Sequence, residues 1–234
     1  MKLGILGGTF DPIHMGHLRS AEEIGHQLHL EKVCLIPSAS PPHKTSEPVT
    51  PFRHRLAMAR LAVSEAPLLE VMDLEGRRPG FSYSIETLME IHGIFRPDPE
   101  IFFILGTDAF LEIQTWKEYR RLFDYAHFVI MRRAGSRPEK IASLLSKLDL
   151  KIKSAMGPDV FIAPSGKALI IMAPTPINIS STRIREMVME RESIRFLVPD
   201  SVREYIMKKG LYKDHANPRK GKALPPDYQG TEGD

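Results

Sequence analysis

The chain has 234 residues, of which 42% are hydrophobic and 26% are charged, as in an ordinary soluble globular protein. It contains no apolar run of about eighteen residues, which excludes a membrane-spanning helix, and its formal net charge of +3 is too small to indicate nucleic-acid binding. Cys34 is the single cysteine, so we expect no internal disulfide and a reduced, cytoplasmic setting. Met1 and Lys2 lead directly into a short strand-like run, so we expect no signal peptide.

Six short apolar runs, each typical of a buried strand, recur along the chain. They lie at residues 3–6, 33–37, 69–72, 101–105, 128–131 and 169–173. Helical patterns separate them, the clearest having apolar positions at Leu18, Ala21, Ile24 and Leu28, at Leu56, Ala59 and Val63, and within residues 83–94. This alternation predicts an α/β fold, a doubly wound parallel sheet with helices on both faces, built from right-handed crossovers.

A glycine-rich stretch, GGTFDPIHMGH at residues 7–17, follows the first predicted strand. Gly7 and Gly8 allow the backbone to turn and to approach a ligand closely. In open parallel sheets ligands bind at the carboxyl ends of strands, and the N-terminus of the following helix favours an anion. His14 and His17 are three residues apart, so both project from one face of the first helical turn and can donate to phosphate oxygens. The stretch predicts a phosphate-binding loop.

Two other interpretations of this histidine pair stay open at this point. A histidine on a helix is usually a surface or core residue, and His26 and His29 have the same spacing with no glycine-rich loop beside them. We interpret that second pair as structural. Zinc binding is the other alternative, but no H-E-x-x-H motif or cysteine pair supplies a third ligand. The stretch also fits neither a P-loop nor a G-x-G-x-x-G dinucleotide motif.

A second candidate phosphate site lies at residues 179–185, ISSTRIR, where a helix begins that continues through Met187 and Val188. Three consecutive hydroxyl residues are good helix caps, which by itself accounts for them. Arg183 and Arg185 in the first turn oppose the helix dipole, however. Their presence there suggests an anion that outweighs this cost.

The two stretches resemble the motifs of the nucleotidyltransferase superfamily with a short H-x-G-H signature. Residues 7–17 match its G-G-(S/T)-F-D-P-x-H-x-G-H pattern, and residues 179–185 match I-S-S-T-x-I-R. The resemblance implies a Rossmann-like sheet that binds ATP or CTP at the first motif and holds the terminal phosphates of the nucleotide at the second. It covers residues 2–212.

The residues between these motifs resemble one branch of the superfamily, nicotinate-nucleotide adenylyltransferase of the bacterial type. The matching segments are PPHK at 41–44, EGRRPGFSYSIETL at 75–88, GTD at 106–108, TWKEY at 115–119, RRAG at 132–135 and the closing segment 197–212. Three positions depart from the pattern of this branch. Ser84 stands where threonine is usual, Glu86 where aspartate is usual, and Lys117 where some members have an aromatic residue.

The resemblance implies adenylyl transfer from ATP to nicotinate mononucleotide, giving deamido-NAD and pyrophosphate in NAD biosynthesis. It implies Mg²⁺ bound with ATP, no metal held by the protein alone, and catalytic roles for His14 and His17. The implied ATP-binding residues are Gly7, Gly8, Thr9, Phe10, Lys44, Ser180, Ser181, Thr182 and Arg185. The implied mononucleotide-binding residues are Tyr83, Ser84, Asp108, Trp116 and Arg133.

Three rival functions remain open from the sequence. Another nucleotidyltransferase, such as one acting on pantetheine phosphate, is the rival of the same class, although that branch is usually shorter and lacks the S-Y-(S/T) and tryptophan pattern. A class I aminoacyl-tRNA synthetase shares the H-x-G-H logic but needs room for an anticodon-binding domain. A nucleotide sensor without catalysis is the third. The sequence does not decide whether the chain forms a homo-oligomer.

Residues 213–234 differ in composition from the predicted nucleotidyltransferase domain at residues 1–212. They contain four basic and four acidic residues and three prolines, with no apolar periodicity. Such a segment buries too little apolar surface to offset its ordering entropy, so we expect a flexible tail, with a partner-binding peptide as the alternative.

Truncation after Lys213 is therefore expected to change neither stability nor turnover. Calorimetry should give a Tm within about 2 °C of the full chain, because a segment without buried contacts contributes little to folding. A loss of several degrees would show instead that residues 214–234 dock on the domain.

Overall fold

The computed structural model describes residues 1–41, 49–132, 138–148, 151–154 and 159–213. Within these ranges the strands form one eight-stranded sheet in the order β3-β2-β1-β4-β5-β8-β7-β6. The strands are β1 (Lys2–Gly8), β2 (Lys32–Pro37), β3 (Leu69–Val71), β4 (Glu100–Gly106), β5 (His127–Met131), β6 (Lys153–Ser154), β7 (Val160–Ile162) and β8 (Ala168–Met172). The six predicted strands all occur, with ends shifted by one or two residues.

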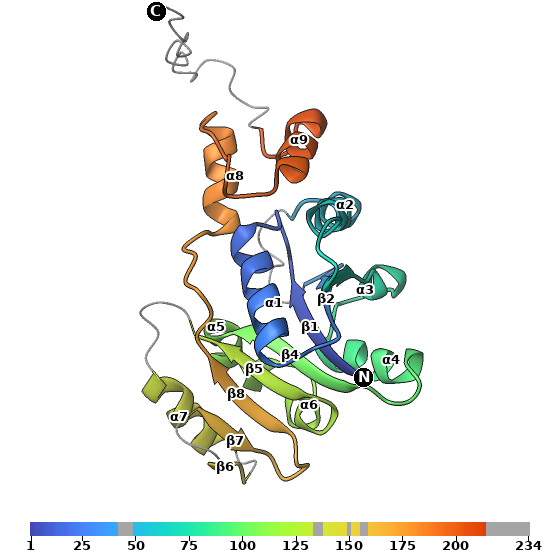
Figure 1. The fold of residues 1–234 in the computed structure, drawn as a ribbon, viewed down its shortest axis with the longest axis vertical. Coiled ribbons are helices and arrows are strands. Elements are labelled where there is room, and N and C mark those ends of the chain that lie inside the picture. The colour runs from blue at the N-terminus through green and yellow to red at the C-terminus, as the bar shows by residue number, and fades with distance from the viewer. Residues whose placement is uncertain (42–48, 133–137, 149–150, 155–158, 214–234) are drawn as a thin grey trace, which may run out of the picture.

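Helices cover both faces of this sheet (Figure 1). In the described part of the chain the helices are α1 (Met15–Gln27), α2 (Phe52–Ala62), α3 (Leu74–Arg77), α4 (Ser84–Ile94), α5 (Thr107–Leu111), α6 (Tyr119–Tyr125), α7 (Pro138–Lys147), α8 (Ser181–Met189) and α9 (Asp200–Lys209), with a 3-10 turn η1 (Ile113–Thr115). One apolar cluster joins the sheet to α3–α7 and the other joins it to α1, α2, α8 and α9. The Rossmann-like α/β class is confirmed.

Strict alternation along the strands explains why both faces are covered. In β4, Ile101, Phe103 and Leu105 belong to the first apolar cluster, while Phe102 and Ile104 belong to the second. Side chains of a strand point to opposite faces in turn, so an uninterrupted apolar run needs a helix on each side. β1 pairs in parallel with β2 on one side and β4 on the other. The strand order therefore reverses between β1 and β4, which is where ligands bind in such sheets.

Two features of the fold differ from the sequence prediction. β7 runs antiparallel to β8, and β6 runs antiparallel to β7, so one edge of the otherwise parallel sheet is antiparallel. These strands have two and three residues, too few to give a periodic signal. The second is the buried face of α2, which is formed by Arg55, Met58 and Ala59, whereas Leu56 is half-buried and Val63 caps the helix.

No helix among the described residues has both the length and the apolar character that crossing a bilayer requires.

His127 links β5 to β8 and β4 through its imidazole. Its Nδ1 accepts a hydrogen bond from the backbone N–H of Ala168 at 2.9 Å, and its ring stacks on Phe102 with centroids 4.8 Å apart. Its Nε2 lies 3.4 Å from Oε1 of Glu100. Burial and the positive charge of Lys167 lower the pKa of His127, although Glu100 acts in the opposite direction. Protonation of Nδ1 would remove the acceptor of the Ala168 N–H.

This arrangement predicts lower stability in mild acid. Below about pH 6.5 the unfolded chain binds a proton that folded His127 resists, so the free energy of unfolding falls with pH in that window. Urea unfolding gives the free energy of unfolding at about pH 7 and about pH 5.5. The decrease of this free energy between the two pH values should be smaller by about 1 kcal/mol in His127→Asn than in the wild type. His26→Asn, at an exposed position, is the control. An equal decrease in His127→Asn and wild type would contradict this assignment.

Candidate functional site

The glycine-rich stretch lies at the carboxyl end of β1 and enters α1. A Cβ atom added at Gly7 would meet no atom within 4 Å, and Gly7 lines a cavity, so a side chain there would occupy ligand space. At Gly8 the reason is different, because a Cβ would lie 3.0 Å from the ring of Phe10. Phe10 is buried in the core. A Cβ at Gly16 would lie 3.1 Å from the ring of His14.

The two histidines of the stretch stack on each other at the start of α1. Their ring centroids are 3.6 Å apart with planes inclined by 22°. The backbone N–H of His14 donates to Nδ1 of His17 at 3.3 Å. Nδ1 is therefore the acceptor nitrogen of His17, which places the proton of the neutral imidazole on Nε2. His17 is thus prepared to donate a hydrogen bond from Nε2.

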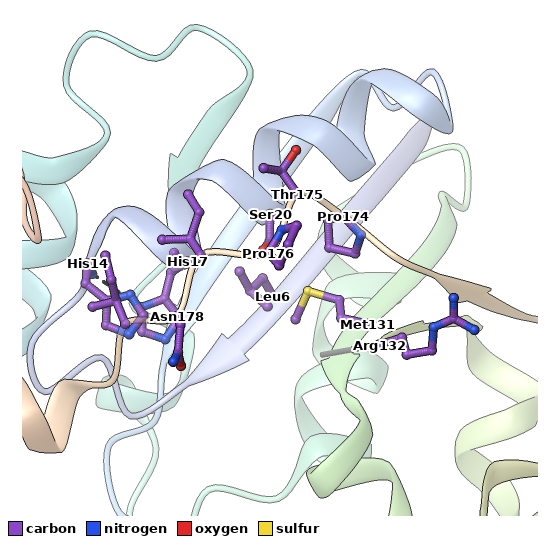
Figure 2. Close-up of a pocket in the computed structure, with 13 residues that line it drawn as sticks. Leu6, His14, His17, Ser20, Met131, Arg132, Pro174, Thr175, Pro176 and Asn178 are labelled. Carbon is purple, nitrogen blue, oxygen red and sulfur yellow. Dashed lines mark hydrogen bonds between the residues drawn. The ribbon is translucent and has the colours of Figure 1, made fainter. Parts of the chain in front are cut away.

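Two cavities meet at His17. The larger has a volume of about 470 Å³, the smaller about 260 Å³, and Leu6, His17 and Met131 line both. The smaller cavity is also lined by His14, Gly16, Ser20, Arg132 and residues 174–179. Figure 2 shows His14 and His17 at one end of this cavity and Arg132 at the other. An extended ligand that filled both cavities would pass directly by His17.

The larger cavity contains most of the predicted mononucleotide residues. Tyr83, Ser84 and Trp116 line it, as do Gly7, Gly8 and Thr9. Trp116 packs edge-on against Phe103, with ring centroids 6.2 Å apart. Tyr83 is the N-cap of α4, so the first backbone N–H groups of that helix begin at the cavity wall.

The hydroxyl residues at the start of α8 lie outside both cavity linings, and contacts from this segment support the glycine-rich loop. Ser180 caps the helix by accepting from the backbone N–H of Arg183 at 3.1 Å. Ser181 donates to the carbonyl oxygen of Pro12 at 2.8 Å. Arg185 donates to the carbonyl oxygen of Asp11 at 2.8 Å and to the hydroxyl of Thr182 at 3.3 Å.

Arg183 does not need a bound anion to explain its place in the first turn of α8. Its guanidinium pairs with Glu186, Glu190 and Glu192 at distances of 3.5, 3.3 and 2.9 Å. These carboxylates compensate the unfavourable position near the helix N-terminus. The argument that an arginine in the first turn of this helix suggests a bound anion therefore applies only to Arg185.

Besides Phe10 and the predicted residues within 180–185, three more predicted residues are not placed in either cavity. Asp108 lies exposed in the first turn of α5 and lines neither one. Lys44 and Arg133 lie outside the residues that the structure describes, as does the chain after Lys213.

Arg55 is the residue of the site that the sequence analysis missed. Its side chain is only 1% exposed, and it donates to the carbonyl oxygens of Thr9, Ala39 and Thr50 at 2.7, 3.2 and 2.8 Å. One guanidinium thereby joins the loops that follow β1 and β2 to the segment before α2. Burial lowers the pKa of Arg55, while the charge of Asp11 raises it. The sequence did contain a signal for this burial. Arg55 precedes Met58 by three residues and Ala59 by four, so it lies on the same face of α2 as these buried residues.

The carboxylate of Asp11 completes this support. Oδ2 accepts from the backbone N–H of Thr50 at 3.0 Å, and Oδ1 accepts from the hydroxyl of Tyr212 at 2.7 Å. Burial and the charge of Asp11 raise the pKa of Tyr212, which keeps its hydroxyl a donor. The loop is thus bound to a residue 201 positions later in the chain.

The fold, the loop at the sheet reversal and the paired cavities define a nucleotidyltransferase. The chain belongs to the cytidylyltransferase-like family, whose model matches residues 5–187. It is 45% identical over 91% of its length to a probable nicotinate-nucleotide adenylyltransferase of Desulfatibacillum aliphaticivorans, all of which is covered. It is 42% identical over 92% of its length to a protein of the same name from Geotalea daltonii, of which 99% is covered.

A solved structure shares the fold. It is the nicotinic acid mononucleotide adenylyltransferase of Plasmodium falciparum complexed with NaAD, with a TM-score of 0.68 and 20% sequence identity. The alignment covers 90% of this chain and 97% of that one. The resemblance inferred from the motifs is confirmed at the level of family and fold.

Substitution Arg55→Lys is expected to weaken both fold and activity. A lysine keeps the charge but cannot reach three carbonyls in a fork, and each lost hydrogen bond to a charged group costs about 1.5–3 kcal/mol. Thermal unfolding should show a Tm lower by roughly 5–10 °C. Arg53→Lys, two positions earlier and exposed, is the matched control. Equal Tm values for the two variants would show that Arg55 does not hold the loops.

Proposed function

We propose that this chain transfers the adenylyl group of ATP to nicotinate mononucleotide and releases pyrophosphate and deamido-NAD. The observation that carries the proposal is the junction of two cavities at His17, one of them lined by aromatic residues. Two nucleotides that fill the cavities would bring their phosphates together at this junction. The names of the relatives and of the fold neighbour support the same substrates.

The reaction needs positioning and charge stabilisation more than proton transfer. The 5′-phosphate of the mononucleotide is already an anion, so it can attack the α-phosphorus of ATP without a general base. His17 would donate from Nε2 to the oxygens whose charge increases in the transition state. His14 would act beside it, and the N-terminus of α1 adds a favourable dipole.

The other predicted residues take their roles in this proposal as follows. Gly7, Gly8 and Thr9 would line the path of the ATP phosphates, and Phe10 would shape the loop from the core. Arg185 and the hydroxyls of Ser180, Ser181 and Thr182, together with Lys44, would hold the leaving pyrophosphate. Trp116 would stack on the pyridinium ring, since a cation over an indole face gains about 0.5–2 kcal/mol. Asp108 and Arg133 would contact ribose and phosphate.

Mg²⁺ would enter as a complex with ATP. Among the described residues no group of three histidine, cysteine or carboxylate side chains could hold a metal ion. Both oxygens of Asp11 in the phosphate loop are already used by Thr50 and Tyr212. In this proposal the ion would be held by phosphate oxygens and water, and it would neutralise charge on the leaving group.

Pyrophosphate release with a panel of acceptors tests the proposal. With ATP, nicotinate mononucleotide should give kcat/KM at least tenfold higher than nicotinamide mononucleotide or pantetheine phosphate. Backbone N–H groups at the start of α4 can bond both oxygens of a carboxylate, whereas an amide NH₂ would oppose donors with a donor, at about 1–3 kcal/mol for each unpaired group. Preference for pantetheine phosphate would assign the chain to another branch, and no turnover would favour a nucleotide sensor.

His17→Ala is expected to lower kcat by about 100-fold or more, as for a lost transition-state donor, with little change in Tm. His26→Ala, at the exposed far end of the same helix, is the control and should keep nearly full activity. His29 is less suitable, because its backbone has φ of +51°, which alanine tolerates poorly. Equal losses of activity in the His17 and His26 variants would contradict the assignment.

A further inference from the structure

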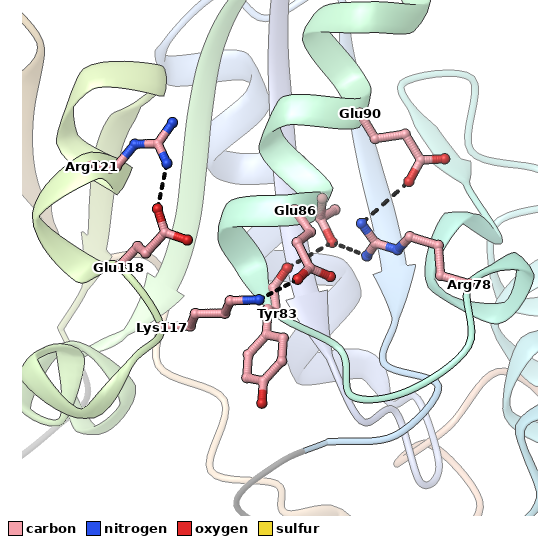
Figure 3. A network of polar contacts seen from close by, with 8 residues as sticks. Arg78, Tyr83, Glu86, Glu90, Lys117, Glu118 and Arg121 are labelled. Carbon is pink, nitrogen blue, oxygen red and sulfur yellow. Dashed lines mark hydrogen bonds and ion pairs between the residues drawn. The ribbon is translucent and has the colours of Figure 1, made fainter.

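Two of the three departures from the branch pattern contact each other in the structure. Nζ of Lys117 lies 2.7 Å from Oε1 of Glu86 (Figure 3). Glu86 is in the first turn of α4, and Lys117 lies between η1 and α6. The pair connects two segments that are 31 residues apart, and Lys117 lines the larger cavity.

The ammonium of Lys117 lies at the aromatic part of this cavity. Its Nζ is 4.5 Å from the ring centroid of Tyr83, and Trp116 is the preceding residue. The neighbouring carboxylate of Glu118 is paired with Arg121, so it does not hold the ammonium (Figure 3). The hydrogen bond to Glu86 raises the pKa of Lys117, which keeps this side chain cationic at neutral pH.

Lys117 supplies the exposed charge on the described wall of this cavity. It is the one lysine or arginine among the described lining residues, and Glu75 is the one carboxylate there. Glu75 is only 8% exposed, and it accepts a hydrogen bond from the hydroxyl of Thr87 at 2.9 Å. That hydroxyl in turn accepts from Arg78 at 2.7 Å. Only Oε1 of Glu75 has a donor, since Oε2 is buried without a hydrogen-bond partner, so this carboxylate stays inside the wall and the exposed ammonium is the charge that a ligand would meet first.

The ion pair that holds the ammonium is weak enough to be exchanged. The side chains of Lys117 and Glu86 are 42% and 39% exposed. Solvent screens such a pair, so little stability is lost when the ammonium turns to another anion. A ligand carboxylate in the less exposed cavity would be a stronger partner, because charge-assisted hydrogen bonds gain from lower screening.

We propose that Lys117 is a specificity residue that favours a mononucleotide with an anionic ring substituent over one with a neutral substituent. This inference rests on the proposed function. Nicotinate and nicotinamide mononucleotides share the pyridinium ring, the ribose and the phosphate, so Lys117 affects these parts equally in both. They differ by one negative charge on the substituent, and an ammonium at the cavity wall acts on that difference.

The test compares kcat/KM for the two mononucleotides in full-length variants. Lys117→Met keeps the length of the side chain and removes its charge. It should lower kcat/KM for the acid about tenfold and change that for the amide less than about threefold, so the acid-to-amide ratio falls. Lys117→Arg should retain the wild-type ratio. Added salt should lower the ratio in the wild type more than in Lys117→Met, because screening weakens only the charged contact.

Glu86→Gln separates the ammonium from the ion pair, because it leaves Lys117 charged and removes its partner. The acid-to-amide ratio should stay the same or rise. Trp116→Ala should lower kcat/KM for both mononucleotides and change the acid-to-amide ratio little. Lys208→Met, at an exposed position on α9, controls for the loss of a positive charge elsewhere.

Two outcomes would overturn the inference. If Lys117→Met lowers kcat/KM equally for both mononucleotides, Lys117 only packs against the cavity wall. If Glu86→Gln lowers the ratio as much as Lys117→Met does, the ion pair is a structural brace and the ammonium does not read the substituent. Failure of the proposed function is a separate result, since the wild-type chain would then form no pyrophosphate from ATP and nicotinate mononucleotide.

Discussion

The loop between β1 and α1 depends on one buried charge. Arg55 is buried and donates to carbonyl oxygens of three segments, two of which directly follow strands β1 and β2. A buried guanidinium without hydrogen-bond partners costs much free energy. If the three segments separated, this charge would either become exposed to solvent or stay buried without partners. This constraint holds the walls of the larger cavity in place before a ligand arrives. Preorganisation of this kind is what a reaction driven by positioning requires.

The same loop is also closed from the C-terminal part of the domain. Ser181 and Arg185 of α8 donate to the carbonyls of Pro12 and Asp11, and the hydroxyl of Tyr212 donates to the Asp11 carboxylate. In the structure α8 and α9 lie beside the ends of α1 and α2 (Figure 1). The second motif thus supports the geometry of the first, apart from any contact it makes with a nucleotide. Loss of a hydroxyl there would affect the histidines through the backbone.

The larger cavity combines a rigid half with an adjustable half. Trp116 is fixed against Phe103, whereas Lys117 is held only by an exposed ion pair and by the ring of Tyr83. The departures at positions 86 and 117 compensate each other, because a glutamate reaches the ammonium across the gap between α4 and the segment before α6. A charge on an exposed wall can tune substrate choice without a large effect on stability.

Much of this protein follows from the sequence alone. Apolar runs located six strands to within two residues, because buried parallel strands have no polar positions to obscure them. The spacing of Gly7, Gly8, His14 and His17 indicated the loop between β1 and α1 that lines the two cavities, since these residues are close together in the sequence. The short edge strands β6 and β7 carry no periodic signal and appeared only in the fold. Arg55, the Asp11–Tyr212 bond and the Lys117–Glu86 pair join positions up to 201 residues apart. Only tertiary structure decides such contacts, because burial and proximity, not residue type, determine which charge meets which partner.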